Sequence, residues 1–185
     1  MIHRRHFSNT LLGLSVASIW PSAHAQSATV KLMVGFAAGG SVDLTARALA
    51  ESMRESLGRQ VIVDNKPGAA GRLVVEAVKQ ARPDGNNLML VPHGPMTLFP
   101  WIHRQLRYDP AKDFTPIGRV CVVDYALTTG PATSAKTLDE YLQWARDPKN
   151  KPSYGSPGAG TIPHFIGQGF TQKTRTDIVH VPYKG

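Results

Sequence analysis

Residues 31–43, KLMVGFAAGGSVD, constrain the fold of this chain more than any other stretch. The apolar run 31–35 predicts a strand that is buried on both faces of a sheet. Small residues follow it, and Ser41 is a favourable N-cap for a helix. Apolar residues then recur at helical spacing until Gly58, which provides a stop. The stretch therefore predicts a strand, a small-residue loop and a helix.

A loop of this kind favours an anion as its ligand. We expect the first backbone N–H groups of the helix to be free there, at the positive end of the helix dipole. Residues 35–40 have neither the glycine spacing of a dinucleotide fingerprint nor the Lys of a P-loop. From the residues alone, a small-anion site and a simple tight turn are equally supported. At Gly40, a side chain would block an anion or forbid the backbone angles required.

The rest of the chain repeats this alternation. Strands are expected at 60–64, 88–91, 152–156 and 178–181, and helices after Gly71, at 97–105, after Thr137 and after Thr161. Residues 114–128 are expected to hold one or two strands, with the lone Cys121 in the core. The order of strands and helices implies an α/β fold with parallel sheets and right-handed crossovers.

The first 25 residues have the features of an export signal. Arg4 and Arg5 precede a short apolar segment, and the small residues Ala23 and Ala25 fit a cleavage site. We expect cleavage after Ala25 and a periplasmic location, by either the Sec or the twin-arginine route. Cleavage lowers the formal charge of +8 by two. The remaining basic residues form no run, which argues against nucleic acid and favours small anions.

Individual polar residues near the two glycine-rich loops have two interpretations each. In the first helical turn, Asp43 either stabilises the helix dipole or contacts a ligand amine. His164 fits a helix cap and a carboxylate donor equally well. The hydroxyls of Ser41 and Thr161 can cap and bind at once, since a hydroxyl both donates and accepts.

Six motifs, in this order, resemble the Bug-type substrate-binding proteins of tripartite tricarboxylate transporters. They are FAAGGSVD (36–43), NKPGAAG (65–71), PDG (83–85), YDP with DFTP (108–116), YGSPGAG (154–160) and HVPYKG (180–185). The resemblance implies a type II periplasmic-binding-protein-like fold with two α/β lobes around a cleft. It also implies a receptor that captures a small carboxylate and delivers it to membrane transporter subunits. We expect a signal peptide at 1–25, a first lobe at 26–125 and the beginning of an incomplete second lobe at 126–185.

Members of that family are longer than this chain. Two α/β lobes need more strands and helices than the residues after Asp147 supply. We therefore expect a fragment or an early-terminated chain, with an unfinished surface at 178–185, and a monomer when the protein is full length. The ligand is expected to be a di- or tricarboxylate, an amino acid or an aromatic acid.

The resemblance also implies the ligand-binding residues, in two loops that hold a carboxylate. The first loop (36–43) contributes Phe36, Ala38, Gly39, Gly40, Ser41 and Asp43; the second loop (156–164) contributes Ser156, Gly158, Gly160, Thr161 and His164. A third segment contributes His93, although the flanking Pro92 and Pro95 lack N–H donors.

Two other functions stay open. One is an exported enzyme that acts on an anionic substrate, which would need a general base beside a nucleophile. Only His164 near Ser156 or Thr161 qualifies, and His103 and His180 are expected to be structural or on the surface. No spacing indicates a metal site or a hydrolase triad, so no metal, cofactor or catalytic residue is expected. The other is a truncated, non-functional remnant.

Overall fold

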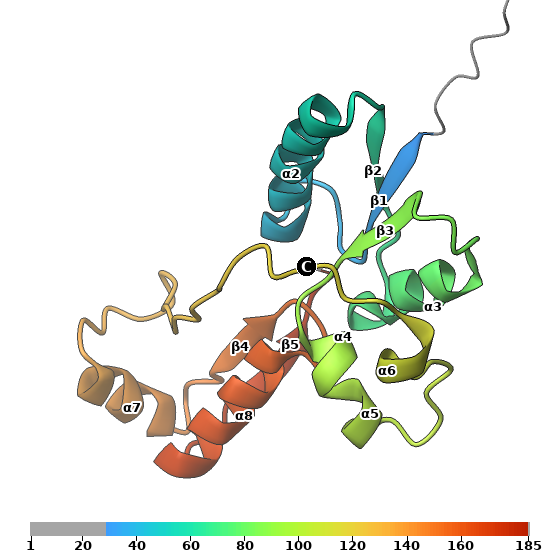
Figure 1. Cartoon of the computed structure of the whole chain (residues 1–185). Helices are drawn as coiled ribbons and strands as arrows, with labels where there is room; N and C mark the ends of the chain where they lie inside the picture. Colours follow the sequence, from blue (N-terminus) through green and yellow to red (C-terminus); the bar gives the residue numbers. More distant parts are fainter. Residues whose placement is uncertain (1–28, 185) are drawn as a thin grey trace, which may run out of the picture.

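The computed structural model describes residues 29–184 (Figure 1). In chain order its elements are β1 (Val30–Val34), α2 (Ser41–Leu57), β2 (Val61–Asn65), the 3₁₀ turn η1 (Ala69–Gly71), α3 (Arg72–Gln80), β3 (Asn87–Leu90), α4 (Gly94–Thr97), α5 (Phe99–Ile102), α6 (Pro110–Asp113), α7 (Leu138–Arg146), β4 (Ser153–Ser156), α8 (Ile162–Thr174) and β5 (Val179–Pro182). The α/β class is confirmed. The expected signal peptide lies outside the described residues.

The first sheet has the order β2-β1-β3, and both pairings are parallel. Leu32 and Val34 on β1 pack against Ala46 and Ala50 of α2, while Met33 packs on the opposite face with α3. Figure 1 shows α2 and α3 on opposite sides of this sheet. The central strand is therefore buried on both faces, as its apolar run predicts. Burial of each large apolar side chain stabilises the fold by about 1.5–3 kcal/mol.

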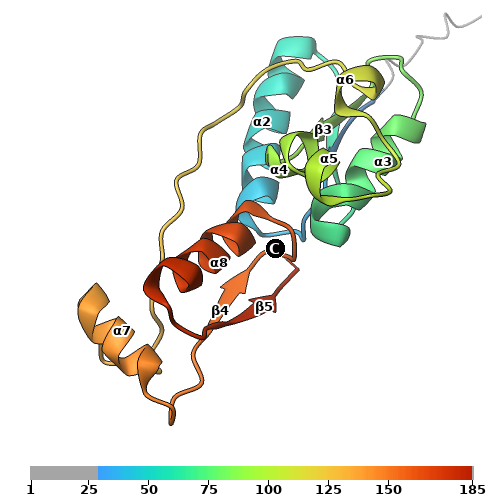
Figure 2. The same ribbon diagram turned by 90° about the horizontal axis from the view of Figure 1, so that it is seen from below.

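A second, smaller sheet consists of β4 and β5, which also pair in parallel. Helix α8 packs against both strands. Residues 114–136 connect the two sheets without a helix or strand, and Figure 2 shows this segment running from α6 to α7. At the end of the second sheet, Ile178 is buried, whereas Val179 and Tyr183 are mostly exposed. The surface expected at 178–185 is thus exposed only in part.

The strands expected within 114–128 are absent from the structure. The segment is extended and exposed, and Cys121 is exposed as well, so its expected place in the core is wrong. Its apolar residues have no sheet beside them: Val122 is 72% exposed. An extended segment becomes a strand only when a neighbouring strand takes up its backbone hydrogen bonds. The apolar pattern of these residues indicates β-propensity, but it cannot show whether a neighbouring strand is available for pairing.

The single helix expected at 97–105 is not observed. Two short helices, α4 and α5, lie in this region instead. Pro100 lies in the first turn of α5. Proline has no N–H, so it cannot donate to a carbonyl in the preceding turn, and the helix is interrupted at Leu98. In the described range 29–184, no helix is long and apolar enough to cross a membrane.

Candidate functional site

A cavity of 330 Å³ lies between the two sheets. The first sheet contributes Gly35, Phe36 and residues 67–70, and the second contributes Pro157, Gly158, Tyr183 and Lys184. These residues follow the carboxyl ends of β1, β2, β4 and β5. The crevice beyond the carboxyl ends of parallel strands is where α/β folds bind ligands. Phe36 and Gly158 are the residues of the expected site that line this cavity.

The first loop is organised around the buried carboxylate of Asp43, which is 1% exposed. Its Oδ2 accepts hydrogen bonds from the Gly39 N–H at 2.8 Å and from Arg47 Nε at 2.9 Å. Its Oδ1 accepts from Asn65 Nδ2 at 2.9 Å, and the same amide donates to the Phe36 carbonyl. The bonds from Arg47, Gly39 and Asn65 hold the pKa of Asp43 far below its usual range. Asp43 therefore joins the first loop, α2 and β2 as a permanent anion.

This arrangement occupies the two amides that precede α2, whereas the N–H groups at the start of the helix itself take no part in it. The Gly39 N–H is taken by Asp43, and the Gly40 N–H lies 3.4 Å from the Ala37 carbonyl. Gly40 itself is the N-cap, without a side-chain cap bond, and Ser41 is the first helical residue instead of the cap. Ala38, Gly39 and Ser41 are exposed, and they do not line the cavity.

Glycine is not required at Gly40, contrary to expectation. Its φ is −76°, which any residue adopts. A Cβ there would meet only the Ala37 carbonyl, at 3.4 Å. Gly158 is different, because its φ is +148° and a Cβ would come within 3.2 Å of the Ala70 Cβ. The position where a side chain would keep the two loops apart is therefore Gly158.

The second loop is closed by hydroxyl groups. Ser156 is buried, and its Oγ lies 3.0 Å from the Gly158 carbonyl, 3.2 Å from the Gly158 N–H and 2.7 Å from Nε2 of His180. The Thr161 hydroxyl donates to the same carbonyl at 2.7 Å and does not cap α8. Both side chains thus hold the backbone of Gly158 in place.

Of the two roles expected for His164, a helix cap and a donor to a carboxylate, its Nδ1 fills the first. Its Nδ1 accepts a hydrogen bond from the Gly160 N–H at 3.1 Å. Its ring stacks on His180, with centroids 4.0 Å apart and 26° between the planes. Burial, and next the charge of His164, lower the pKa of His180. His180 is a structural residue of the second loop, as expected, through its bond to Ser156.

The base-and-nucleophile pair required of an enzyme is thus Ser156 with His180, not with His164. The Ser156 hydroxyl also bonds to Gly158, and it is 5% exposed. Within the part of the chain that the structure describes, no carboxylate bonds to His180 and no cluster of His, Cys, Asp or Glu suits a metal ion. The geometry therefore favours a binding site.

Residues 67–70 and Lys184 line the cavity but were not expected there. Gly68, Ala69, Ala70 and Gly71 all have positive φ, and the two alanines, at +48° and +55°, are strained by about 1–3 kcal/mol each. Strained backbone of this kind is concentrated at functional sites. Residues 67–70 belong to the motif NKPGAAG, and Lys184 belongs to HVPYKG. The glycines of the first motif and the lysine of the second are the sequence features that could have indicated a role in the cavity.

His93 lies away from the cavity, at the start of α4. Its side chain is exposed, and its carbonyl accepts hydrogen bonds from the N–H groups of Met96 and Thr97. The structure therefore uses the backbone of His93 to begin a helix.

Comparisons with known proteins agree with this fold. Residues 45–185 match the TctC family, described as tripartite tricarboxylate transporter family receptors. A UPF0065 protein of Bordetella bronchiseptica is 34% identical over 177 residues, which cover 94% of this chain and 51% of the relative. The periplasmic binding protein BugD is similar in structure, with a TM-score of 0.71 and 30% identity, over 85% of this chain and 52% of BugD.

A third similar protein was solved with a ligand. Rpa4515 of R. palustris, with adipate, has a TM-score of 0.77 and 29% identity over 85% of this chain and 52% of its own. The chain thus spans about half the length of the relatives it matches. The match to the family covers most of the chain and includes β2 and β3 of the first sheet and both strands of the second. The chain belongs to the family of tripartite tricarboxylate transporter receptors, whose members include the Bug proteins.

Proposed function

We propose that this chain is an extracytoplasmic receptor that captures a small carboxylate in the cavity between its two sheets. The observation that best supports this function is the cavity itself, which lies at the carboxyl ends of four parallel strands and is lined by loops from both sheets. The adipate in Rpa4515 supports a dicarboxylate as the ligand. The receptor delivers its ligand to the membrane subunits of a tripartite transporter.

The proposal includes the organisation of the chain. A signal peptide of residues 1–25 directs export to the periplasm, and cleavage follows Ala25. Residues 26–125 belong to a first lobe and residues 126–185 to a second, which agrees with the separate sheets. The segment 114–136 joins the lobes, so ligand contacts from both sides favour the closed arrangement.

Lys184 gives the cavity its charge selectivity. Among the described lining residues it is the only one with a charged side chain, so its ammonium is the natural partner of a ligand carboxylate. Phe36 and Gly158 supply the apolar wall and the close backbone approach. Asp43, Ser156, Thr161 and His164 act through the two loops: they fix the backbone that the ligand meets.

Calorimetric titration with adipate and malate tests the proposal. Lys184→Gln removes a charged hydrogen bond of about 1.5–3 kcal/mol, so the affinity should fall about ten- to hundredfold. Gly158→Val should abolish binding, because its Cβ meets Ala70 and its φ is unsuited to a branched residue. Gly40→Val is the matched control and should bind like the wild type.

Two outcomes would contradict the proposal. One is an unchanged affinity in both Lys184→Gln and Gly158→Val, which would place the carboxylate elsewhere. The other is turnover of an ester or phosphate substrate that Ser156→Ala abolishes, which would make the Ser156–His180 pair catalytic. Thermal melting of each variant shows whether a lost affinity reflects a lost fold.

A further inference from the structure

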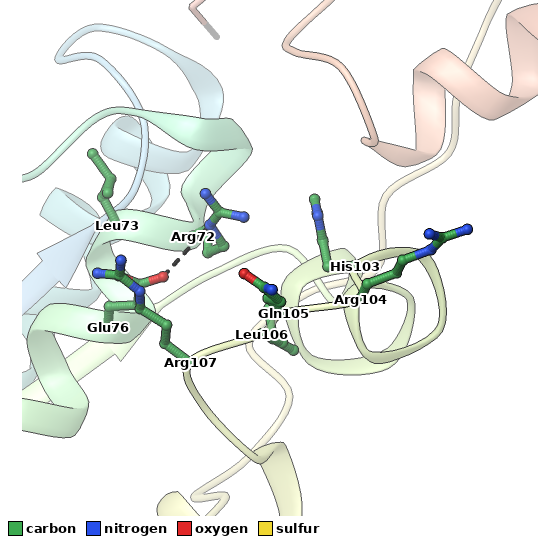
Figure 3. A pocket seen from close by; sticks show the side chains of 8 residues that line it. All are labelled: Arg72, Leu73, Glu76, His103, Arg104, Gln105, Leu106 and Arg107. Atoms are coloured by element: carbon green, nitrogen blue, oxygen red, sulfur yellow. Dashed lines mark ion pairs between the residues drawn. The ribbon is translucent and has the colours of Figure 1, made fainter.

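A second cavity, of 740 Å³, is lined by residues between Arg72 and Arg107. Helix α3 forms one wall, and residues 103–107, after α5, form the other (Figure 3). None of its lining residues lines the cavity between the two sheets. It is therefore a separate site on the same molecule.

The wall of this second cavity is strongly basic. Arg72, Arg104 and Arg107 contribute three guanidinium groups, whereas Glu76 is the only carboxylate among the lining residues. Within the described chain, the guanidinium groups of Arg104 and Arg107 have no ion-pair partner. Since Arg104 points away from the other lining side chains (Figure 3), Arg72 and Arg107 together exceed Glu76 by one positive charge on the cavity side.

Arg72 has a donor without an acceptor. Its Nε lies 3.5 Å from Glu76 Oε1, which makes an ion pair but is too long for a hydrogen bond. The same Nε is buried, and in the described residues it has no hydrogen-bond acceptor. A buried donor in this position is costly until an acceptor reaches it.

Neutral donors lie beside the guanidinium of Arg72. In Figure 3 the side chains of Arg72 and His103 point the same way, with Gln105 between them, while Arg104 points away. The His103 ring packs edge-on against Phe99, with centroids 4.8 Å apart, which fixes its orientation. Guanidinium, amide and imidazole groups together match an anion that has several oxygen atoms.

We propose that this second cavity binds an oxyanion with several oxygen atoms, of the class of phosphate or citrate, beside Arg72, with Arg107, Gln105 and His103 as further donors. Such an anion neutralises the surplus positive charge of the cavity and supplies acceptors for several donors.

Titration of the purified chain with inorganic phosphate, citrate and acetate at low ionic strength tests this site. Phosphate or citrate should saturate one site, and acetate should bind at least about tenfold more weakly. Arg72→Gln should weaken binding about ten- to hundredfold. Arg119→Gln removes the same charge from the connecting segment, outside the cavity, and should change the affinity less than about twofold.

A second measurement, on the wild-type chain, tests the same site even if Arg72→Gln folds poorly. Burial, and next the charge of Arg72, lower the pKa of His103, so a bound anion should raise that pKa. Nuclear magnetic resonance of the His103 ring in the wild type reports this directly. The site is refuted by an unshifted His103, or by equal losses in Arg72→Gln and Arg119→Gln.

Discussion

The first and second loops are each held by a side chain four residues further along the chain. At the start of α2, the Gly39 N–H donates to the carboxylate of Asp43 at 2.8 Å. At the start of α8, the Gly160 N–H donates to the imidazole of His164 at 3.1 Å. In both helices the acceptor is the third helical residue. The bonds have equivalent geometry, but the acceptors have different acid–base chemistry.

That difference indicates how the two loops respond to acid. Arg47, Gly39 and Asn65 lower the pKa of Asp43 so far that its carboxylate remains charged at any ordinary pH. The second loop, in contrast, is held in part by the imidazole of His180, which bonds to Ser156. Burial, and next the charge of His164, lower the pKa of His180. The first loop is thus fixed, whereas the second loop is pH-sensitive.

The largest expected effect follows from removal of the fixed acceptor. Asp43→Ala leaves the Gly39 N–H, Asn65 and Arg47 without the oxygen atoms that they now contact. The melting temperature should fall by about 5 °C or more, as measured by circular dichroism. Glu51→Ala on the exposed face of α2 is the control, and it should shift the melting temperature by no more than about 1 °C. Equal shifts would mean that Asp43 is no more than another surface acid.

An intermediate effect is expected when the wild type is acidified. The pKa of His180 is lowered from 6.5, so the unfolded chain takes up the proton first. The free energy of unfolding should therefore decrease as the pH falls below about 6.5. Because the His180 ring bonds to Ser156 of the second loop, its protonation should cost about 1 kcal/mol there and weaken adipate binding about fivefold between pH 7.5 and 5.5. An affinity that is constant over this range would show that the second loop does not loosen.

The exposed His93 provides the control for that titration. It lies outside the ring stack of His164 and His180, so His93→Asn should retain the full loss of affinity in acid.

The smallest effect at neutral pH, and the sharpest test of the comparison, is expected from His164→Asp. This substitution gives the second loop the acceptor that the first loop already has. At pH 7.5 the affinity for adipate should stay within about threefold of the wild type, because a carboxylate also suits the start of a helix. Between pH 7.5 and 5.5 the profile should become flatter, because the charge of His164 no longer lowers the pKa of His180. A variant that remains as acid-sensitive as the wild type would show that His164 does not act on His180.

Much of the fold could be predicted because its signals are local. The apolar run of β1, the helical periodicity of α2 and the Thr137 cap of α7 all depend on residues close in sequence. The Thr137 Oγ1 accepts from the Glu140 N–H, and the Glu140 carboxylate accepts from the Lys136 N–H, an arrangement close to a capping box at the start of the helix expected after Thr137. Parallel pairing then follows from the alternation of strands and helices.

Other features could not be predicted, because they depend on residues that are distant in sequence. Whether Val122 joins a strand depends on a neighbouring strand, and none lies beside it. The amide of Gly39 is occupied because Asp43 is itself aligned by Asn65 on the next strand. The role of Lys184 depends on a cavity that two sheets make together. The composition of the sequence and the spacing of its residues contain no information on these long-range contacts.

The unpaired segment at 114–136 also has a consequence for ligand capture. Within the described chain it joins the two sheets together with the short helices on either side of it, so the loops that line the cavity meet in an intramolecular encounter. Their effective concentration is set by the contour length and stiffness of this connection, not by how much protein is present. A stiffer or shorter connection would lower the entropic cost of closure and slow the release of the ligand, without any change in a residue that touches it.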